Sequence, residues 1–235
     1  MLTGLETMEE KKISEISRDD FLRYKEAFIS AAIRCQKAGF DGIELHCAHG
    51  MYLDEVLETS IRSDEYGGCF ENRIRLLEEL ITEIRKNCGG NFIIAVRFGN
   101  SDYEELINAA ITIEKAGADI LDVSSGIARY SNIPNNFLYD SKIYAASLVK
   151  NHVHIPVICV GNIFTGNIGE SIIDNEYADM IAVGRGHLSD PAWANKTLAG
   201  VPVNQCLQCK NCLWWINGNL CAARRKEKQK NGISS

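Results

Sequence analysis

The sequence predicts an α/β fold: a partial TIM (β/α)8 barrel of about five parallel strands with helices, followed by a short Cys-rich segment. Helical and strand patterns alternate from Phe21 to about Ala199. The predicted strands are short and continuously apolar, which is typical of parallel strands that helices cover on both faces. The first strand, Ile43 to Leu45, stops at His46 and His49. Barrels of this kind have their active sites at the carboxyl ends of their strands.

The first half of the chain holds two helix–strand units. The acidic pair Asp19-Asp20 precedes apolar residues that recur at helical spacing from 21 to 35, and Gly39 stands where a glycine commonly ends a helix. The strand 43–46 follows. A second helix is carried by apolar residues from 74 to 84 and ends at Gly89-Gly90, before the strand 92–98.

The second half continues the alternation. Its predicted elements are a helix at about 102–116, a strand 120–124, a helix near 141–150, a strand 157–160, a short helix 168–175 and a strand 180–183. A complete barrel has eight strands and typically about 250 residues. We therefore expect the first three strands to be missing, and an open sheet to need a second copy, an N-terminal half or another subunit to cover it.

Four segments are expected. Residues 1–20 form a flexible N-terminal segment, 21–200 the partial barrel, 201–224 the Cys-rich segment and 225–235 a disordered tail. The net charge of −6 argues against a nucleic-acid or anionic-membrane partner, since either would require a basic surface. No apolar run approaches the roughly 20 residues that cross a bilayer, and the start lacks a signal-peptide pattern. We expect a cytoplasmic protein that acts on a small molecule.

Seven segments resemble a known family, in the family's own order. The chain is similar to the old yellow enzyme group of flavin oxidoreductases, including its 2,4-dienoyl-CoA reductase branch, from about residue 21 to 221. The segments are Ala-Gly-Phe-Asp-Gly-Ile-Glu-Leu-His (38–46), Asp-Glu-Tyr-Gly-Gly (64–68), Glu-Asn-Arg (71–73), Val-Arg-Phe (96–98), Val-Ser-Ser-Gly (123–126), Val-Gly-Asn-Ile (160–163) and Val-Gly-Arg (183–185).

Two loops are candidates for holding a phosphate. Gly161 and Asn162 follow the penultimate strand, and Gly184 and Arg185 follow the last one. Barrels often bind phosphate between these loops, where glycines let the backbone approach and an arginine adds a charge-assisted contact. The resemblance implies that the phosphate belongs to FMN. The alternative is that both glycines form tight turns only.

Arg97 and the two histidines are the candidates for chemistry. Arg97 ends an apolar strand, so it needs a polar site or an ion pair, with Glu44 as one partner. The resemblance implies that Arg97 lies beside the flavin pyrimidine ring and stabilises the reduced flavin. In their neutral form, the imidazoles of His46 and His49 can polarise a carbonyl-activated C=C bond. A metal site at these histidines would need a third ligand, and the sequence offers none nearby. The remaining alternative is that the two histidines have no functional role.

Tyr52 is the candidate proton donor. Many family members read His-x-x-His-Gly-Tyr-Leu, whereas this chain has Met51 after Gly50, so the tyrosine is displaced by one position. If Met51 occupies the family's tyrosine position, another group or water must protonate the substrate.

Four cysteines are closely spaced near the C-terminus: Cys206, Cys209, Cys212 and Cys221. Such thiolates can converge on one metal centre. The resemblance to the dienoyl-CoA reductase branch implies a [4Fe-4S] cluster. Zinc is the alternative because zinc sites built from four cysteines use similar spacing. A third interpretation is that the four cysteines bind no metal and are close in sequence by chance.

The resemblance implies NAD(P)H-dependent reduction of activated alkenes, such as enones or enoyl thioesters, on FMN. No GxGxxG fingerprint is present in the sequence, so NAD(P)H must bind at the flavin or an electron-donor protein must supply the electrons. The alternative is a truncated, non-catalytic remnant or subunit that binds a metal through its cysteines.

Overall fold

A computed structural model describes residues 13–58, 62–100, 102–125 and 132–230. It contains one five-stranded sheet in which neighbours in sequence are neighbours in space, in the order β1-β2-β3-β4-β5. All four pairings are parallel. The strands are β1 (Gly42–Cys47), β2 (Ile93–Phe98), β3 (Ile120–Val123), β4 (Val157–Val160) and β5 (Met180–Ala182). The predicted α/β fold with five parallel strands is confirmed.

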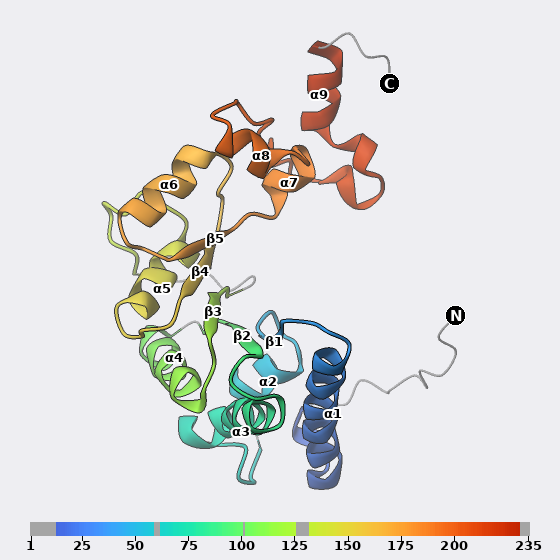
Figure 1. The fold of residues 1–235 in the computed structure, drawn as a ribbon. Coiled ribbons are helices and arrows are strands. Elements are labelled where there is room, and N and C mark those ends of the chain that lie inside the picture. Colours follow the sequence, from blue (N-terminus) through green and yellow to red (C-terminus); the bar gives the residue numbers. More distant parts are fainter. Residues whose placement is uncertain (1–12, 59–61, 101, 126–131, 231–235) are drawn as a thin grey trace.

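Helices precede, connect and follow the strands, and those between strands lie along one side of the sheet (Figure 1). They are α1 (Arg18–Lys37), α2 (Tyr52–Glu58), α3 (Phe70–Cys88), α4 (Tyr103–Ala116), α5 (Ser141–Lys150), α6 (Gly166–Asp174), α7 (Arg185–Ser189), α8 (Trp193–Leu198) and α9 (Ala222–Lys230). Three 3-10 turns complete the described elements: η1 (Ile13–Glu15), η2 (Leu213–Trp215) and η3 (Gly218–Leu220). None of these helices is both long and apolar enough to span a bilayer.

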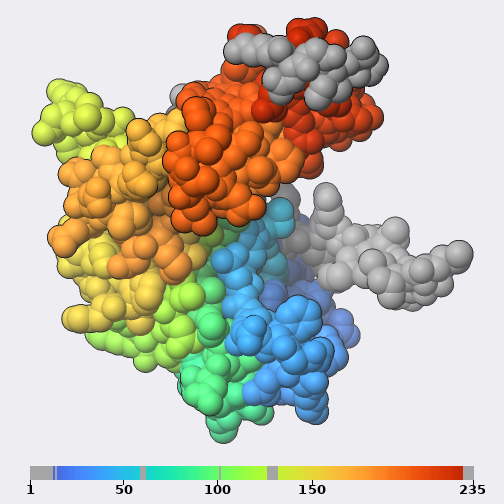
Figure 2. Space-filling model, turned by 45° about the horizontal axis from the view of Figure 1, so that its top comes forward, coloured from blue at the N-terminus to red at the C-terminus, as the bar shows by residue number. Residues whose placement is uncertain are grey.

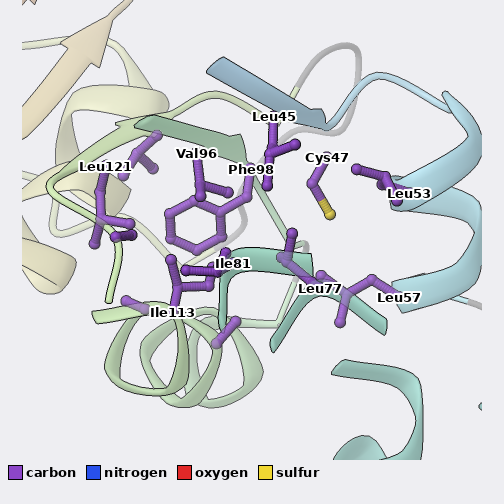
Figure 3. Packing of buried hydrophobic residues seen from close by; sticks show 14 of the residues in the cluster. Leu45, Cys47, Leu53, Leu57, Leu77, Ile81, Val96, Phe98, Ile113 and Leu121 are labelled. Atoms are coloured by element: carbon purple, nitrogen blue, oxygen red, sulfur yellow. The ribbon is translucent and has the colours of Figure 1, made fainter. Parts of the chain in front are cut away.

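The core lies between the sheet and these helices. Alternate strand residues, among them Val96, Phe98 and Leu121, are fully buried. Figure 3 shows the Phe98 ring directed from the sheet toward Ile81 of α3 and Ile113 of α4. Burying a side chain of this size contributes about 1.5–3 kcal/mol, so this face of the sheet fixes the positions of β1 to β3.

The other face of the sheet is open in the described part of the chain. Glu44, Ile93 and Met180 lie on it, and Ile93 and Met180 are 41% and 37% exposed. The strand residues therefore alternate between a face that the helices cover and an accessible face, as expected for an open part of a barrel sheet. The open face carries polar side chains toward the carboxyl ends of β1 to β3.

The N-terminal segment is more ordered than its sequence suggests. Arg62 donates from Nη1 to the carbonyl oxygens of Ile13 (2.7 Å) and Ile16 (2.9 Å), and both isoleucines are buried. The Arg62 guanidinium also stacks over the Phe21 ring at 4.7 Å and pairs with Asp64. A long-range contact of one arginine therefore orders residues 13–16, which local sequence patterns cannot reveal. Residues 1–12 lie outside the described part.

The C-terminal segment also departs from expectation. Residues 225–230, assigned to a disordered tail, continue helix α9. Their Arg, Lys, Glu and Gln side chains favour helix. Glu227 anchors the helix by accepting from Asn204 Nδ2 at 3.1 Å and pairing with Lys196 at 3.6 Å. Figures 1 and 2 show this segment projecting at the upper end of the molecule. Residues 231–235, and Gly126 of the Val-Ser-Ser-Gly motif, are outside the described part.

Substituting Arg62→Met will lower the free energy of unfolding by about 2–4 kcal/mol, because two carbonyl groups and a carboxylate lose a buried, charged donor. Urea unfolding measures the change. The matched control is Arg23→Met, whose side chain is 73% exposed and pairs with Asp20 within one helix turn; it will change stability by about 0.5 kcal/mol or less. Equal effects of the two substitutions would contradict the structural role of Arg62.

Candidate functional site

The carboxyl ends of β1, β2 and β3 bring three polar side chains into one row. His46 is the register partner of Arg97, and Arg97 is the register partner of Asp122. Side chains of register partners in neighbouring parallel strands point to the same face of the sheet. The flanking residues Val96 and Phe98 are buried in the core, so the side chain of Arg97 between them must point to the open face.

Arg97 forms an ion pair with Asp122, with 3.2 Å between Nε and Oδ2. The alternative partner considered from sequence, Glu44, is not the one found, because Glu44 pairs in register with Ala95 and not with Arg97. Burial raises the pKa of Asp122 to about 6; the Arg97 charge lowers that pKa and Glu44 raises it further. Arg97 Nε and Asp122 Oδ1 are buried and lack hydrogen-bond partners among the described residues.

His46 and His49 lie edge to face, with their ring centroids 5.0 Å apart and their planes at 71°. His49 Nε2 is 2.8 Å from Ser124 Oγ, and Arg97 Nη2 donates to the same oxygen at 3.3 Å. Burial lowers the pKa of His49, and the charges of Arg97, His46 and Lys142 lower it further. His49 is therefore a neutral hydrogen-bonding group at pH 7.

Tyr52 is not brought together with the histidines. Its ring contacts Phe21, Tyr24 and Phe28 of α1, at centroid distances of 6.0, 5.5 and 6.2 Å. The hydroxyl is buried without a hydrogen-bond partner among the described residues, and burial raises the pKa of Tyr52 well above its usual value. A tyrosine in this environment holds its proton tightly, which argues against a role as proton donor.

The two glycine loops lie side by side. Arg185 Nη2 donates to Asn162 Oδ1 at 2.6 Å, and Asn162 Nδ2 donates to Asp140 Oδ2 at 2.7 Å. Gly161 has a φ of +143°, and a Cβ there would lie 2.7 Å from Cβ of Asp140, so the position requires glycine. A Cβ at Gly184 would meet nothing within 4 Å. The structure thus brings four of the sequence-predicted residues together, with open space beside Gly184.

These residues fit a flavin phosphate and ring. Arg185 bonds to a neutral amide, so its charge is available to an anion, and Lys142 adds a second cation beside Asp140 at 3.0 Å. The Nε of Arg97 is a buried donor without a hydrogen bond, and a polar ligand can satisfy it. Arg97 and Lys142 both lie close enough to His49 to lower its pKa, so the histidines border this positive region.

The four cysteines near the C-terminus are free thiols; Cys209 and Cys212 are exposed, and Cys206 and Cys221 are partly buried. Within the described residues no three His, Cys, Asp or Glu side chains gather as a group that holds a metal ion. The described structure therefore does not bring these cysteines together as a metal-binding group.

Four residues of the site escaped sequence reasoning: Asp122, Ser124, Asp140 and Lys142. Asp122 lies within the strand pattern Ile-Leu-Asp-Val, and its position beside Arg97 depends on the strand register. Ser124 belongs to a family motif but had no role assigned to it. Asp140 is the N-cap of α5 and reaches Asn162 across 22 residues of sequence. A polar residue inside an apolar strand was the one signal that pointed to Asp122.

Comparison with known proteins identifies relatives along most of the chain. The family model described as NADH:flavin oxidoreductase / NADH oxidase family matches residues 3–204. An NADH oxidase of Thermoanaerobacter brockii is 36% identical over 211 residues, which are 83% of this chain and 32% of that protein. An NADPH dehydrogenase of Halalkalibacterium halodurans is 36% identical over 195 residues, covering 80% of this chain and 55% of the relative.

Solved structures with the same fold include an amine oxidase for 6-hydroxypseudooxynicotine from Pseudomonas geniculata, with a TM-score of 0.70, 29% identity and coverage of 84% of this chain and 32% of that one. An old yellow enzyme homologue from Zymomonas mobilis has a TM-score of 0.66 and 23% identity over 82% of this chain and 56% of its own. The chain thus spans about half the length, or less, of the relatives that it matches.

Replacing Asp122 by Asn will change how stability depends on pH. The pKa of Asp122 is raised to about 6 in the folded protein, so stability contributed by its protonated form is complete below about pH 4 and is lost as pH rises through 6. Asn does not titrate. The free energy of unfolding of Asp122→Asn relative to the unsubstituted protein will therefore rise by on the order of 2 kcal/mol between pH 4 and pH 7.5, measured by urea unfolding.

Asp64→Asn is the control of opposite sign. Arg62 holds the pKa of Asp64 below its usual value, so its stabilising contribution is present above about pH 4 and is lost on acidification. Parallel pH profiles for Asp122→Asn and the unsubstituted protein would contradict the environment described for Asp122.

Proposed function

The chain belongs to the NADH:flavin oxidoreductase / NADH oxidase family, and we therefore propose that it forms part of an FMN-dependent oxidoreductase that takes electrons from NAD(P)H. The observation that carries the proposal is the positive cluster beside two imidazoles at one edge of the sheet: Arg97 is within 3.3 Å of the serine that contacts His49. The names NADH oxidase and NADPH dehydrogenase of its relatives agree with this chemistry.

We assign the FMN phosphate to Gly161, Asn162, Gly184 and Arg185, and the flavin ring to the neighbourhood of Arg97. FMN, when bound, supplies hydride transfer. Arg97 contributes a positive charge that favours negative charge on the ligand, and its ion pair with Asp122 holds the guanidinium in place. The loops place neutral and positive donors around the open space at Gly184.

His46 and His49 orient the substrate in this proposal. Neutral imidazoles donate hydrogen bonds to a carbonyl oxygen without adding a net charge, and they withdraw electron density from a conjugated double bond. The substrate class is an activated alkene such as an enone or an enoyl thioester. The proton comes from solvent, since the Tyr52 hydroxyl is buried against α1.

The open face of the sheet supports a proposal on assembly. A parallel sheet is stable when both faces are covered, and here one face carries exposed Ile93 and Met180. We propose that further strands cover this face, contributed by an N-terminal half, a second copy or another subunit. An electron-donor protein is the alternative to NAD(P)H binding at the flavin itself.

Binding of FMN tests the cofactor. Titration of FMN fluorescence will show binding by the unsubstituted chain and a Kd raised about 10- to 100-fold in Arg185→Ala, the cost of one charge-assisted contact. The control is Arg225→Ala, on the exposed side of α9. Absence of FMN binding by the unsubstituted chain would favour the alternative of a non-catalytic subunit, and equal losses in both variants would indicate nonspecific charge attraction.

Tyr52→Phe will leave the rate of enone reduction within about threefold and raise the free energy of unfolding by about 1 kcal/mol. The change removes a buried hydroxyl that has no partner among the described residues, and an unpaired polar group costs about 1–3 kcal/mol. Steady-state kinetics and urea unfolding provide the two values. A rate loss of a hundredfold or more would restore Tyr52 as the proton donor.

For the cysteine segment we propose that the thiols bind a [4Fe-4S] cluster, as in the 2,4-dienoyl-CoA reductase branch. Zinc is the alternative metal. Its support is the spacing of Cys206, Cys209, Cys212 and Cys221 alone. The four thiols do not gather in this structure, and no step of the proposed reaction passes through them. Iron, zinc and sulfide analysis of anaerobically purified protein tests the proposal, which active, metal-free protein would contradict.

A further inference from the structure

The Ser124 hydroxyl lies between the cation and the imidazole of the candidate site. Ser124 follows β3, and its residue surface is only 3% exposed. Its backbone N–H donates to the carbonyl of Phe98 at 2.8 Å, which fixes the serine against the end of β2. Within the described residues, its hydroxyl has two partners: Arg97 Nη2 at 3.3 Å and His49 Nε2 at 2.8 Å.

Counting donors and acceptors fixes the direction of the Arg97 hydrogen bond and favours one direction for the His49 hydrogen bond. A guanidinium has no acceptor, so Arg97 donates and Ser124 Oγ accepts. The hydroxyl proton then needs an acceptor, because leaving a buried donor unpaired costs about 1–3 kcal/mol. Among the residues that the structure describes, His49 Nε2 is the acceptor within reach. It can accept only if it carries no proton, which requires the neutral ring with its proton on Nδ1.

We propose that Ser124 is a positioning residue that holds His49 in the Nδ1–H tautomer. The lowered pKa of His49 agrees with a neutral ring. Because Nε2 is engaged with Ser124, Nδ1–H is the ring donor of His49 that remains for a ligand. This inference rests on the proposed function for its consequence, the orientation of the substrate carbonyl, but the tautomer itself is a property of the chain alone.

The backbone of the histidine loop bears on the position of His49. His49 has a φ of 66° and Gly50 a φ of 72°, both in the left-handed region. A histidine in this region is uncommon and needs compensating contacts. Two are present: the Ser124 bond to the ring, and the bond from Gly50 N–H to Asp54 Oδ2 at 2.7 Å. Ser124 therefore restrains the position of the His49 ring.

Long-range proton–nitrogen NMR of protein labelled with 15N-histidine tests the proposal without any cofactor. His49→Gln identifies the His49 signals. In the unsubstituted chain at pH 7.5 we expect the proton on Nδ1 and an unprotonated Nε2. Ser124→Ala will shift the ring to the Nε2–H form that free histidine prefers, and Ser124→Thr, which keeps the hydroxyl, will retain Nδ1–H.

Ser147→Ala is the matched control, because Ser147 is another buried serine whose hydroxyl bonds to the Tyr144 carbonyl on α5. It will leave the His49 signals unchanged. An Nε2–H tautomer in the unsubstituted chain, or an unchanged tautomer in Ser124→Ala with a native urea transition, would overturn the proposal. Failure to bind FMN would refute the proposed function and leave the tautomer result standing, so the two outcomes are separable.

Discussion

The ion pair between Arg97 and Asp122 depends on packing that happens on the opposite side of the sheet. Val96 and Phe98 are fully buried against α3 and α4, and this burial forces Arg97 onto the accessible face. The same alternation places Asp122 beside it, with 3.2 Å between the charged atoms. Because Arg97 also contacts Ser124, and Ser124 contacts His49, the geometry of the whole site is transmitted from the core through one guanidinium. Shifting β2 by one residue would bury the charge and expose Val96.

The electrostatic character of the site follows from how its charged side chains are paired. Arg97, Lys142 and Arg185 lie at the carboxyl edge, and the acids Asp122 and Asp140 compensate the first two. Arg185 is bonded to the amide of Asn162. Glu44 on the same face is a third acid near this edge, so the three cations are matched by three acids. Arg185 makes no ion pair with an acid among the described residues and is the cation available to an anionic ligand, and the charges of Arg97 and Lys142 contribute to the lowered pKa of His49.

Sequence patterns located the strands within one or two residues, because short apolar runs between helices are a strong signal. They also singled out His46, Arg97 and the glycine loops as candidates, since a polar residue at a strand end is conspicuous, and the structure places His46 and Arg97 in one row. They did not pair Arg97 with Asp122, because register between strands is a tertiary property. The environment of Tyr52 was equally hidden, as it depends on how α1 packs on α2. The spacing of the cysteines suggested a metal site, but proximity in sequence did not produce convergence in the described structure.

The hydrogen bonds from Arg62 to the N-terminal turn also bear on how the chain folds. The bond from Arg62 to Ile13 closes a loop of 49 residues that contains α1, β1 and α2. The entropy lost on closing such a loop grows with the logarithm of its length and amounts to a few kcal/mol, about (3/2)RT ln n. The register partners of β1 and β2, such as Gly42 and Ile93, are 51 residues apart (93 − 42), so docking of the Ile13–Ile16 turn and pairing of β1 with β2 close loops of similar length. Protection of the turn's amide protons from exchange therefore reports that the two ends of this loop have met.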